Sequence, residues 1–349
     1  MTARALRVGI LGYGSIGRTH HRALAECAGA EVVAATRSRA GAETGERESS
    51  ITWCVDAEEL IGRTDVDVIS ICTPSGSHAT LAIEAMQAGK HVVVEKPLCT
   101  DVETGERAVR LARDSGLLLS VISQRRFEPQ NIHLRGLLDE GLLGRPILGE
   151  ALVRWYRGQD YYDSAPWRGT LAEDGGVLLN QAIHVVDLLC WLLGPVAEVS
   201  ATTATLAHEI EAEDTAVANL RFASGALGVV AASTATRPGL PAELNLFFES
   251  GAVGVHDERV VRWDVPERTP APPVDGGAGS GASDPAAITA LGHLRQWRDI
   301  VAALREGREP SVTGEDGLAT AAVVLSAYES ARTGRTVRPA QAVAEIGAP

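Results

Sequence analysis

The order of apolar runs in the first 125 residues constrains the fold more than any other feature of this chain. Short runs rich in β-branched residues alternate with stretches of helical pattern. We expect strands over 6–11, 31–36, 66–73, 91–96 and 117–122, and helices over 15–28, 56–61, 78–88 and 102–115. Continuous apolar strands separated by helices are typical of a parallel sheet covered on both faces. The sequence therefore predicts an α/β, doubly wound domain over residues 1–125.

The pattern changes after Phe127. An apolar helix is expected over 176–193, followed by long runs of alternating apolar and polar residues up to 265. Such alternation is typical of antiparallel strands with one apolar face. We expect further helices over 131–140, 286–306 and 314–332, and a mobile loop over 266–285, which is rich in Pro, Gly and Ala. Residues 126–349 are thus predicted to form an α+β domain with an open, mostly antiparallel sheet. A free sheet face needs a cover, which predicts a homodimer or homotetramer.

Charge and cysteine content limit the partners of the chain. The formal net charge is −13, and no basic cluster offsets it, which argues against nucleic acid and acidic membranes as partners. The five cysteines are odd in number and form no CxxC pair, which favours reduced thiols in the cytoplasm and disfavours a metal site. No apolar run is long enough, or free enough of polar residues, for a membrane span or signal peptide. We expect a cytoplasmic protein that acts on a small molecule.

A glycine fingerprint stands at the first strand-to-helix junction. In "GILGYGSIGRTH", Gly12 permits a tight turn, Gly14 lets the backbone approach a pyrophosphate, and Gly17 allows close packing of helix on strand. The N–H groups at the start of the helix would then bind the phosphates. Three glycines can also form an ordinary turn, but their place in a βαβ unit favours dinucleotide binding.

The end of the second expected strand bears on which dinucleotide is bound. An acidic residue there would bind the ribose 2′-hydroxyl of NAD, but the sequence "AATRSRAG" places Arg37 and Ser38 at this point. A guanidinium suits a 2′-phosphate. We predict NADP(H), with NAD(H) as the alternative if Arg37 only belongs to a solvated loop.

One lysine stands out in a chain that otherwise uses arginine. Of the 32 basic residues only Lys90 and Lys96 are lysines. Lys96 follows the fourth strand, at the edge where open α/β sheets bind ligands, and Pro97 restricts the turn after it. Lysine can exchange a proton near neutral pH and arginine cannot. Lys90 follows a helix end and is expected only to bind its last carbonyl groups.

These motifs together resemble those of the Gfo/Idh/MocA oxidoreductases. The matching pieces are the glycine fingerprint, "CTPSGSHATLAIEAMQAGKHVVVEKP", "WRGT", "GGVLLNQAIHVVDLL" and "VTGEDGLATAAVVLSAYESARTGR", in the family's order. The resemblance implies a Rossmann domain, a second domain that mediates oligomers, and nicotinamide-dependent chemistry on sugars, nucleotide-sugars or cyclitols. It also implies that Lys96 is the catalytic acid/base, that His184 is its partner, and that Trp167 and Arg168 belong to a loop that reaches the cofactor.

The sequence departs from the family pattern at one position. Many members place an aspartate four residues before the histidine, where this chain has Asn180. Asn180 and His184 share a helical face, so Asn180 could orient a substrate hydroxyl, although it cannot take a proton. The form "NQAIH" is most similar to the branch that acts on nucleotide-linked amino sugars, such as UDP-N-acetylglucosaminuronate 3-dehydrogenases.

Structural roles remain open for several of these residues. His184 could pair with Asp187, which is itself expected to be structural; Trp167 and Arg168 could form a surface cation–π pair. Tyr161 and Tyr162 could line a sugar pocket or belong to the core.

The resulting functional prediction is an NADP-preferring oxidoreductase acting on a CH–OH group. Lys96, His184 and Asn180 are the predicted catalytic residues. The predicted cofactor-binding residues are Gly12, Gly14, Ser15, Ile16, Gly17, Arg37, Ser38, Thr73, Pro74, His78, Glu95, Lys96, Trp167 and Arg168. A non-catalytic sensor of cofactor or sugar is the alternative, although a binder needs no titratable lysine and histidine. A glycosidase that uses NAD transiently is a third possibility, and Arg37 argues against it.

Overall fold

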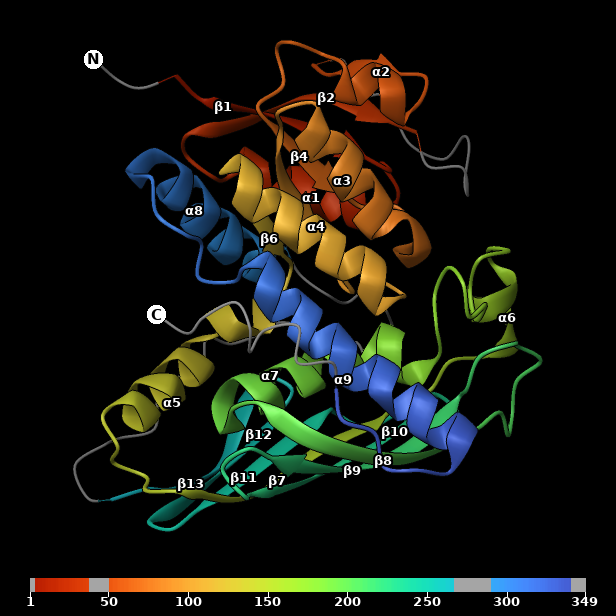
Figure 1. Cartoon of the computed structure of the whole chain (residues 1–349), viewed down its shortest axis with the longest axis vertical. Coiled ribbons are helices and arrows are strands. Elements are labelled where there is room, and N and C mark those ends of the chain that lie inside the picture. Colours follow the sequence, from red (N-terminus) through yellow and green to blue (C-terminus); the bar gives the residue numbers. More distant parts are fainter. Residues whose placement is uncertain (1–3, 38–49, 267–289, 340–349) are drawn as a thin grey trace. The chain divides into compact units, whose positions relative to one another are not determined.

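The computed structural model describes residues 4–37, 50–266 and 290–339 and divides the chain into two compact units. The first unit comprises residues 1–124 with 290–319, and the second comprises residues 125–289 with 320–349 (Figure 1). Ser38 and residues 267–285 of the expected loop lie outside the described residues.

A six-stranded parallel sheet forms the centre of the first unit, in the order β3-β2-β1-β4-β5-β6. Its strands are β1 (Leu6–Leu11), β2 (Ala30–Thr36), β3 (Thr52–Cys54), β4 (Val68–Ile71), β5 (His91–Val94) and β6 (Leu119–Val121). This order confirms the predicted doubly wound class. β3 was not expected, and β5 ends at Val94, before Glu95 and Lys96 of the predicted strand, as the chain approaches Pro97, which has no N–H to donate.

Five α-helices belong wholly to the described part of the first unit. They are α1 (Ser15–Ala25), α2 (Ala57–Ile61), α3 (His78–Gln87), α4 (Val102–Ser115) and α8 (Leu291–Glu306). Helix α8 comes from the C-terminal part of the chain and packs against α1, with Trp297, Ile300 and Val301 buried in the same core as Val8 and Val93.

A seven-stranded mixed sheet forms the second unit, in the order β13-β12-β11-β7-β10-β9-β8. Its strands are β7 (Pro146–Arg154), β8 (Val196–Ala204), β9 (Thr215–Phe222), β10 (Leu227–Ser233), β11 (Glu243–Phe248), β12 (Gly251–His256) and β13 (Arg259–Asp264). The sheet is antiparallel except between β7 and β10, so the predicted mostly antiparallel sheet is confirmed. Residues 251–265, expected as one run, form the hairpin of β12 and β13, which turns at Asp257 (φ 50°).

Helices cover one face of this sheet, as Figure 1 shows for α7. They are α5 (Pro129–Asp139), α7 (Ile183–Leu193) and the part of α9 (Gly314–Thr333) from Thr320 onward, while α6 (Gln159–Asp163) follows β7 outside this cover. Gly149 of β7 lets α7 approach, because a Cβ at this glycine would lie 2.5 Å from Leu189 and from Leu193. The helix expected over 176–193 is interrupted by a π-helical turn at Leu178–Ala182.

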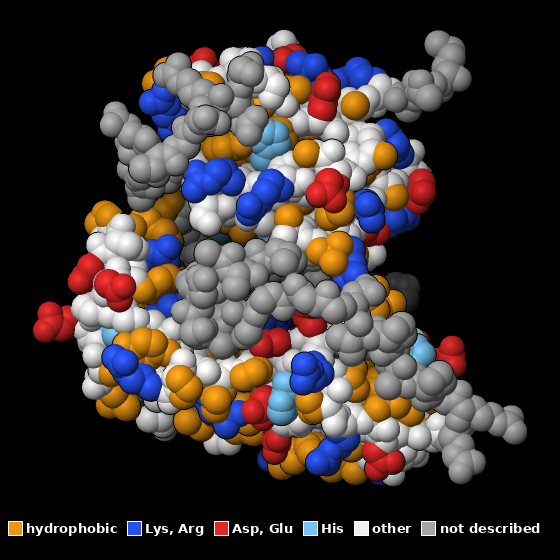
Figure 2. Space-filling model, turned by 180° about the vertical axis from the view of Figure 1, so that it is seen from behind, with side chains coloured by type: hydrophobic (Ala, Val, Ile, Leu, Met, Phe, Trp, Pro, Cys, Tyr) orange, Lys and Arg blue, Asp and Glu red, His pale blue; other side chains and the backbone are white. Residues whose placement is uncertain are grey.

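The other sheet face carries the alternate residues of each strand, which are partly or fully exposed in β9. Figure 2 shows apolar, acidic and basic side chains interspersed on the view it presents of this unit. The homodimer or homotetramer stays a prediction. Among the described residues, no helix combines the length and apolar character that a membrane crossing requires.

Candidate functional site

The glycine turn of the first unit has the geometry of a phosphate-binding loop. Gly12 has φ 88°, and a Cβ at this residue would lie 2.8 Å from the carbonyl oxygen of Cys72. Helix α1 begins behind Gly14 without a side-chain cap and without an acidic residue in its first turn. By contrast, the carboxylates of Asp56 and Asp101 cap α2 and α4. The start of α1, with the predicted residues Ser15 and Ile16, can therefore offer its N–H groups to a cofactor pyrophosphate.

The end of β2 is tied to this turn. The Thr36 hydroxyl accepts a hydrogen bond from the Gly12 N–H at 2.9 Å, and the Thr36 carbonyl accepts one from the Tyr13 N–H at 3.0 Å. Arg37 follows directly and is exposed. The Arg37 side chain thus starts next to the glycine turn, at the position where this class of domain binds the ribose 2′-hydroxyl or 2′-phosphate.

Glu95 is buried beneath Lys96 and holds its backbone. Glu95 is only 5% exposed. Its Oε1 lies 3.0 Å from His20 Nε2 and 3.2 Å from His293 Nε2. Its Oε2 accepts the backbone N–H of Lys96 at 3.2 Å. Burial opposes ionisation of the carboxyl, but the hydrogen bonds from both histidines keep the pKa of Glu95 well below its usual range. The predicted direct contact of Glu95 with the cofactor stays a prediction, and its visible role is to anchor Lys96.

The two histidines and Glu95 also have the composition of a metal site, since their ligand atoms lie within 4.8 Å of one another. The surrounding hydrogen bonds favour a different arrangement. Trp297 donates its indole N–H to His20 Nδ1 at 3.3 Å, so Nδ1 carries no proton and the proton of a neutral His20 lies on Nε2, facing Glu95. An Nε2–H donates a hydrogen bond and cannot ligate a metal. The cluster is therefore best described as a hydrogen-bonded network.

His78 fixes the turn that follows Lys96. The buried ring lies between two carbonyl oxygens, with Nδ1 2.7 Å from that of Pro97 and Nε2 2.8 Å from that of Thr73. Burial lowers the pKa of His78. Thr73 and Pro74 follow β4, next to the end of β5, and are partly exposed.

Lys90 has a structural role, though not at the helix end to which it was assigned. Its ammonium donates hydrogen bonds to the carbonyl oxygens of Arg63 at 2.6 Å and Val66 at 2.8 Å, which lie in the loop before β4. The close approach of this loop, rather than α3 itself, supplies the acceptors.

The predicted catalytic residues of the second unit lie one helical turn apart. Asn180 belongs to the π-helical turn and His184 to the first turn of α7, and both are partly exposed. Asn180 donates its side-chain N–H to Oδ1 of Asp174, a buried residue that the sequence did not single out. Asp187 is structural as expected, and its carboxylate is bound by Arg126 at 2.7 Å and by Thr320 at 3.0 Å.

A second buried acid supports the start of this segment. Glu213, which is 6% exposed, accepts the Leu178 N–H at 2.9 Å and the Tyr328 hydroxyl at 3.1 Å, both on Oε1. Burial raises the pKa of Glu213 to about 7. A glutamate 35 residues away in sequence thus holds the π-helical turn that contains Asn180.

Arginine and aromatic side chains gather beside this segment. The Arg168 guanidinium lies 4.2 Å from the ring centroid of Tyr161 and 4.6 Å from that of Trp167. The cation–π pair of Trp167 and Arg168 therefore exists, while their contact with a cofactor stays a prediction. Tyr162 is buried, with its hydroxyl 2.7 Å from that of Thr234, and belongs to the core.

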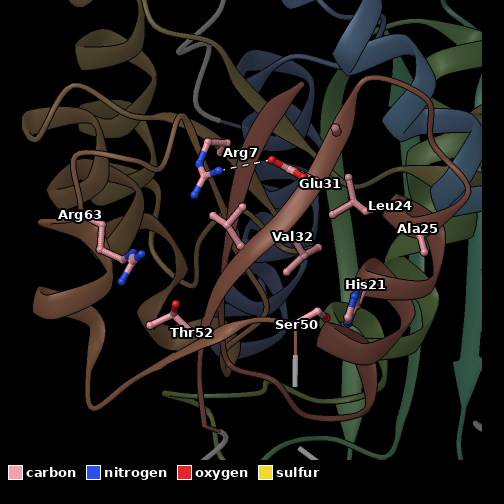
Figure 3. A pocket seen from close by; sticks show the side chains of 11 residues that line it. Arg7, His21, Leu24, Ala25, Glu31, Val32, Ser50, Thr52 and Arg63 are labelled. Carbon is pink, nitrogen blue, oxygen red and sulfur yellow. Dashed lines mark hydrogen bonds and ion pairs between the residues drawn. The ribbon is translucent and has the colours of Figure 1, made fainter. Parts of the chain in front are cut away.

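A hollow of about 520 Å³ opens elsewhere on the first unit (Figure 3). Among its lining residues, Arg7 reaches toward Glu31, with 3.4 Å between the guanidinium and the carboxylate. The hollow borders the first residues of β2, opposite the strand end where Thr36 meets the glycine turn, so it is separate from the cofactor residues.

The first unit brings Lys96 and its own predicted cofactor residues, apart from Ser38, which lies outside the described residues, to the carboxyl ends of β1, β2, β4 and β5. The second unit holds Asn180, His184, Trp167 and Arg168. Sequence reasoning missed His20, His293, Asp174 and Glu213. Of these, His20 lies inside the glycine fingerprint and Asp174 lies between "WRGT" and "GGVLLNQAIHVVDLL", whereas His293 and Glu213 stand near no recognised motif.

Comparison with known proteins decides the family. Residues 6–123 match the oxidoreductase family with an NAD-binding Rossmann fold, and residues 132–254 match the GFO/IDH/MocA C-terminal domain. The chain belongs to the Gfo/Idh/MocA oxidoreductases. Its fold is similar to that of the WlbA dehydrogenase from Bordetella pertussis, solved in complex with NADH and UDP-GlcNAcA, with a TM-score of 0.86, 34% identity and coverage of 97% of this chain and 99% of that one.

Two characterised relatives are cyclitol dehydrogenases. The chain is 28% identical to the inositol 2-dehydrogenase of Rhizobium meliloti over 95% of this chain and 98% of the relative. It is 26% identical to the scyllo-inositol 2-dehydrogenase (NADP(+)) of Bacillus subtilis over 95% of each. The predicted family and nicotinamide cofactor class are thereby confirmed.

Proposed function

We propose that this protein transfers a hydride between NADP(H) and the secondary alcohol or ketone of a sugar, nucleotide-sugar or cyclitol. The observation that carries the proposal is the placement of Lys96, anchored by buried Glu95, at the same sheet edge as the glycine turn. A bound nicotinamide supplies hydride donation or acceptance. The relatives support this substrate range: one was solved with a nucleotide-linked sugar acid, and two act on inositols.

Lys96 is proposed to exchange the proton of the reacting hydroxyl, while His184 hydrogen-bonds the same oxygen. A lysine serves this role when part of it is neutral near the operating pH, which partial burial favours. Lys96 is partly buried and its backbone is fixed. The preference for NADP over NAD rests on exposed Arg37 beside the phosphate-binding turn and on the absence of an acid at that position.

Nicotinamide absorbance with myo-inositol, scyllo-inositol and UDP-GlcNAcA, with both cofactors and in both directions, tests the proposal. Turnover should fall about 10²- to 10⁴-fold in Lys96→Met, the range expected when an acid/base group is removed. NADPH binding, followed by its fluorescence, should be unchanged in this variant. Retention of more than a few per cent of the turnover would contradict the role of Lys96. Tight NADPH binding without turnover of any of these compounds would favour the sensor.

A further inference from the structure

The site segment of the second unit begins with an irregular turn. Leu178–Ala182 form a π-helical turn, a feature often found at functional sites, and Asn180 lies within it. Asn180 keeps its backbone hydrogen bond to the Gly176 carbonyl oxygen at 2.9 Å.

Asp174 binds the side-chain amide of Asn180. It is only 2% exposed, and its two carboxylate oxygens bind different parts of the site. Oδ2 accepts the Gly169 N–H at 2.9 Å, from the loop that contains Trp167 and Arg168, and Oδ1 accepts the Asn180 side-chain N–H. A buried carboxylate needs such donors, because its charge is otherwise costly to remove from water.

A carboxylate can only accept hydrogen bonds, so the amide atom of Asn180 that faces Asp174 must be the nitrogen. We infer that Asp174 is a positioning residue that fixes the polarity of Asn180, so that Asn180 presents its carbonyl oxygen to a substrate hydroxyl. This inference rests on the proposed function and refines it. Asn180 would then select a substrate with a hydroxyl group facing it, because a keto oxygen has no hydrogen to donate to an amide oxygen.

The same arrangement accounts for the departure from the family pattern. The acid that many members place four residues before the histidine is replaced here by Asn180, and Asp174 supplies a carboxylate one hydrogen bond away. Asn180 orients the substrate hydroxyl and transfers no proton. The proton exchange stays with Lys96.

Exchange of the two side chains tests the inference directly. In Asp174→Asn, the new amide oxygen can keep the Gly169 N–H, but its NH₂ group would face the NH₂ of Asn180. Relief requires Asn180 to turn over and present NH₂ to the substrate, so kcat/KM should fall roughly 10- to 100-fold. In Asn180→Asp, two close carboxylates share one proton, and activity relative to wild type should fall as the pH is raised.

The double variant, which combines Asp174→Asn with Asn180→Asp, restores the pairings with Gly169 and between positions 174 and 180. The amide now at position 174 would accept the Gly169 N–H with its oxygen and donate with its nitrogen to the carboxylate now at position 180. We therefore expect kcat/KM to recover to within about fivefold of wild type and to lose the added pH dependence. Asp214→Asn is the matched control. Asp214 is a fully buried carboxylate of the same unit that binds the backbone N–H groups of Leu206 and Ala207, so this change should lower the melting temperature and leave kcat/KM of the folded enzyme unchanged.

Additive losses in the double variant, with no recovery, would overturn the inference. A side-chain amide NMR signal of Asn180, assigned by its loss in Asn180→Asp, provides a measurement without turnover. It should exchange slowly with water in wild type and shift in Asp174→Asn; fast exchange in wild type would also overturn the inference. Lys96→Met is measured alongside, because activity in that variant would refute the proposed function instead.

Discussion

Glu213 should make the stability of the second unit depend on pH. Its carboxyl is buried beside Asp214 and Tyr328, and burial raises its pKa from 4.5 to about 7. In the folded protein the group therefore holds its proton over a range in which the unfolded chain has released it. The free energy of unfolding should then fall as the pH rises from about 4.5 to about 7, and become constant above that.

The size of this effect follows from the same two values. The pKa of Glu213 rises from 4.5 to about 7 on folding, and each pKa unit corresponds to about 1.4 kcal/mol. The free energy of unfolding should therefore fall by about 3 kcal/mol over this pH range. Glu213→Gln removes the titration but keeps the contacts, because Leu178 and Tyr328 both donate to Oε1, which the amide retains.

Urea unfolding of the second unit between pH 4.5 and 8, for wild type and Glu213→Gln, measures the difference. The stability of wild type relative to the variant should decline by about 3 kcal/mol over this range. Glu140→Gln, at an exposed glutamate after α5, controls for the substitution itself. A wild-type-to-variant difference that stays constant within about 0.5 kcal/mol would refute the reasoning.

Two further predictions concern the first unit. Arg37→Asp should lower kcat/KM with NADPH roughly 100-fold and leave kcat/KM with NADH nearly unchanged, since a carboxylate repels a 2′-phosphate. The control is Arg110→Asp, at an exposed arginine. An equal loss with both cofactors, or a similar change in the control, would argue against a 2′-phosphate contact. Glu95→Gln should place an amide NH₂ against the Lys96 N–H and destabilise that turn by about 1–3 kcal/mol. We expect kcat to fall about tenfold with little change in the dissociation constant of NADPH, and an unaltered kcat would show that Glu95 does not position Lys96.

Several features of this protein could be predicted because they depend on neighbours in sequence. Continuous apolar strands between helices determine a parallel sheet, and the spacing of Gly12, Gly14 and Gly17 determines the turn before α1. Lys96 was singled out by its rarity and by its place after β5, and its catalytic role stays a prediction. Strand ends were less certain, since the strand expected over 91–96 ends with its last apolar residue, Val94, before Glu95 and Lys96.

The groups around these residues depend on contacts that local pattern does not encode. His293 contacts Glu95, 198 residues away in sequence, because α8 belongs to the first unit. The amphipathic pattern of α8 does not specify this, since it would fit a helix packed on either sheet. β7 pairs in parallel with β10. The sequence did not predict this pairing, because the alternation of a strand fixes which of its faces is buried and not which strand lies beside it. Asp174 meets Asn180 only because the π-helical turn and the preceding loop bring the two side chains together. The sequence by itself thus determined the two classes of sheet and the glycine turn and singled out Lys96, while tertiary packing decided which buried acids hold the predicted site residues in place.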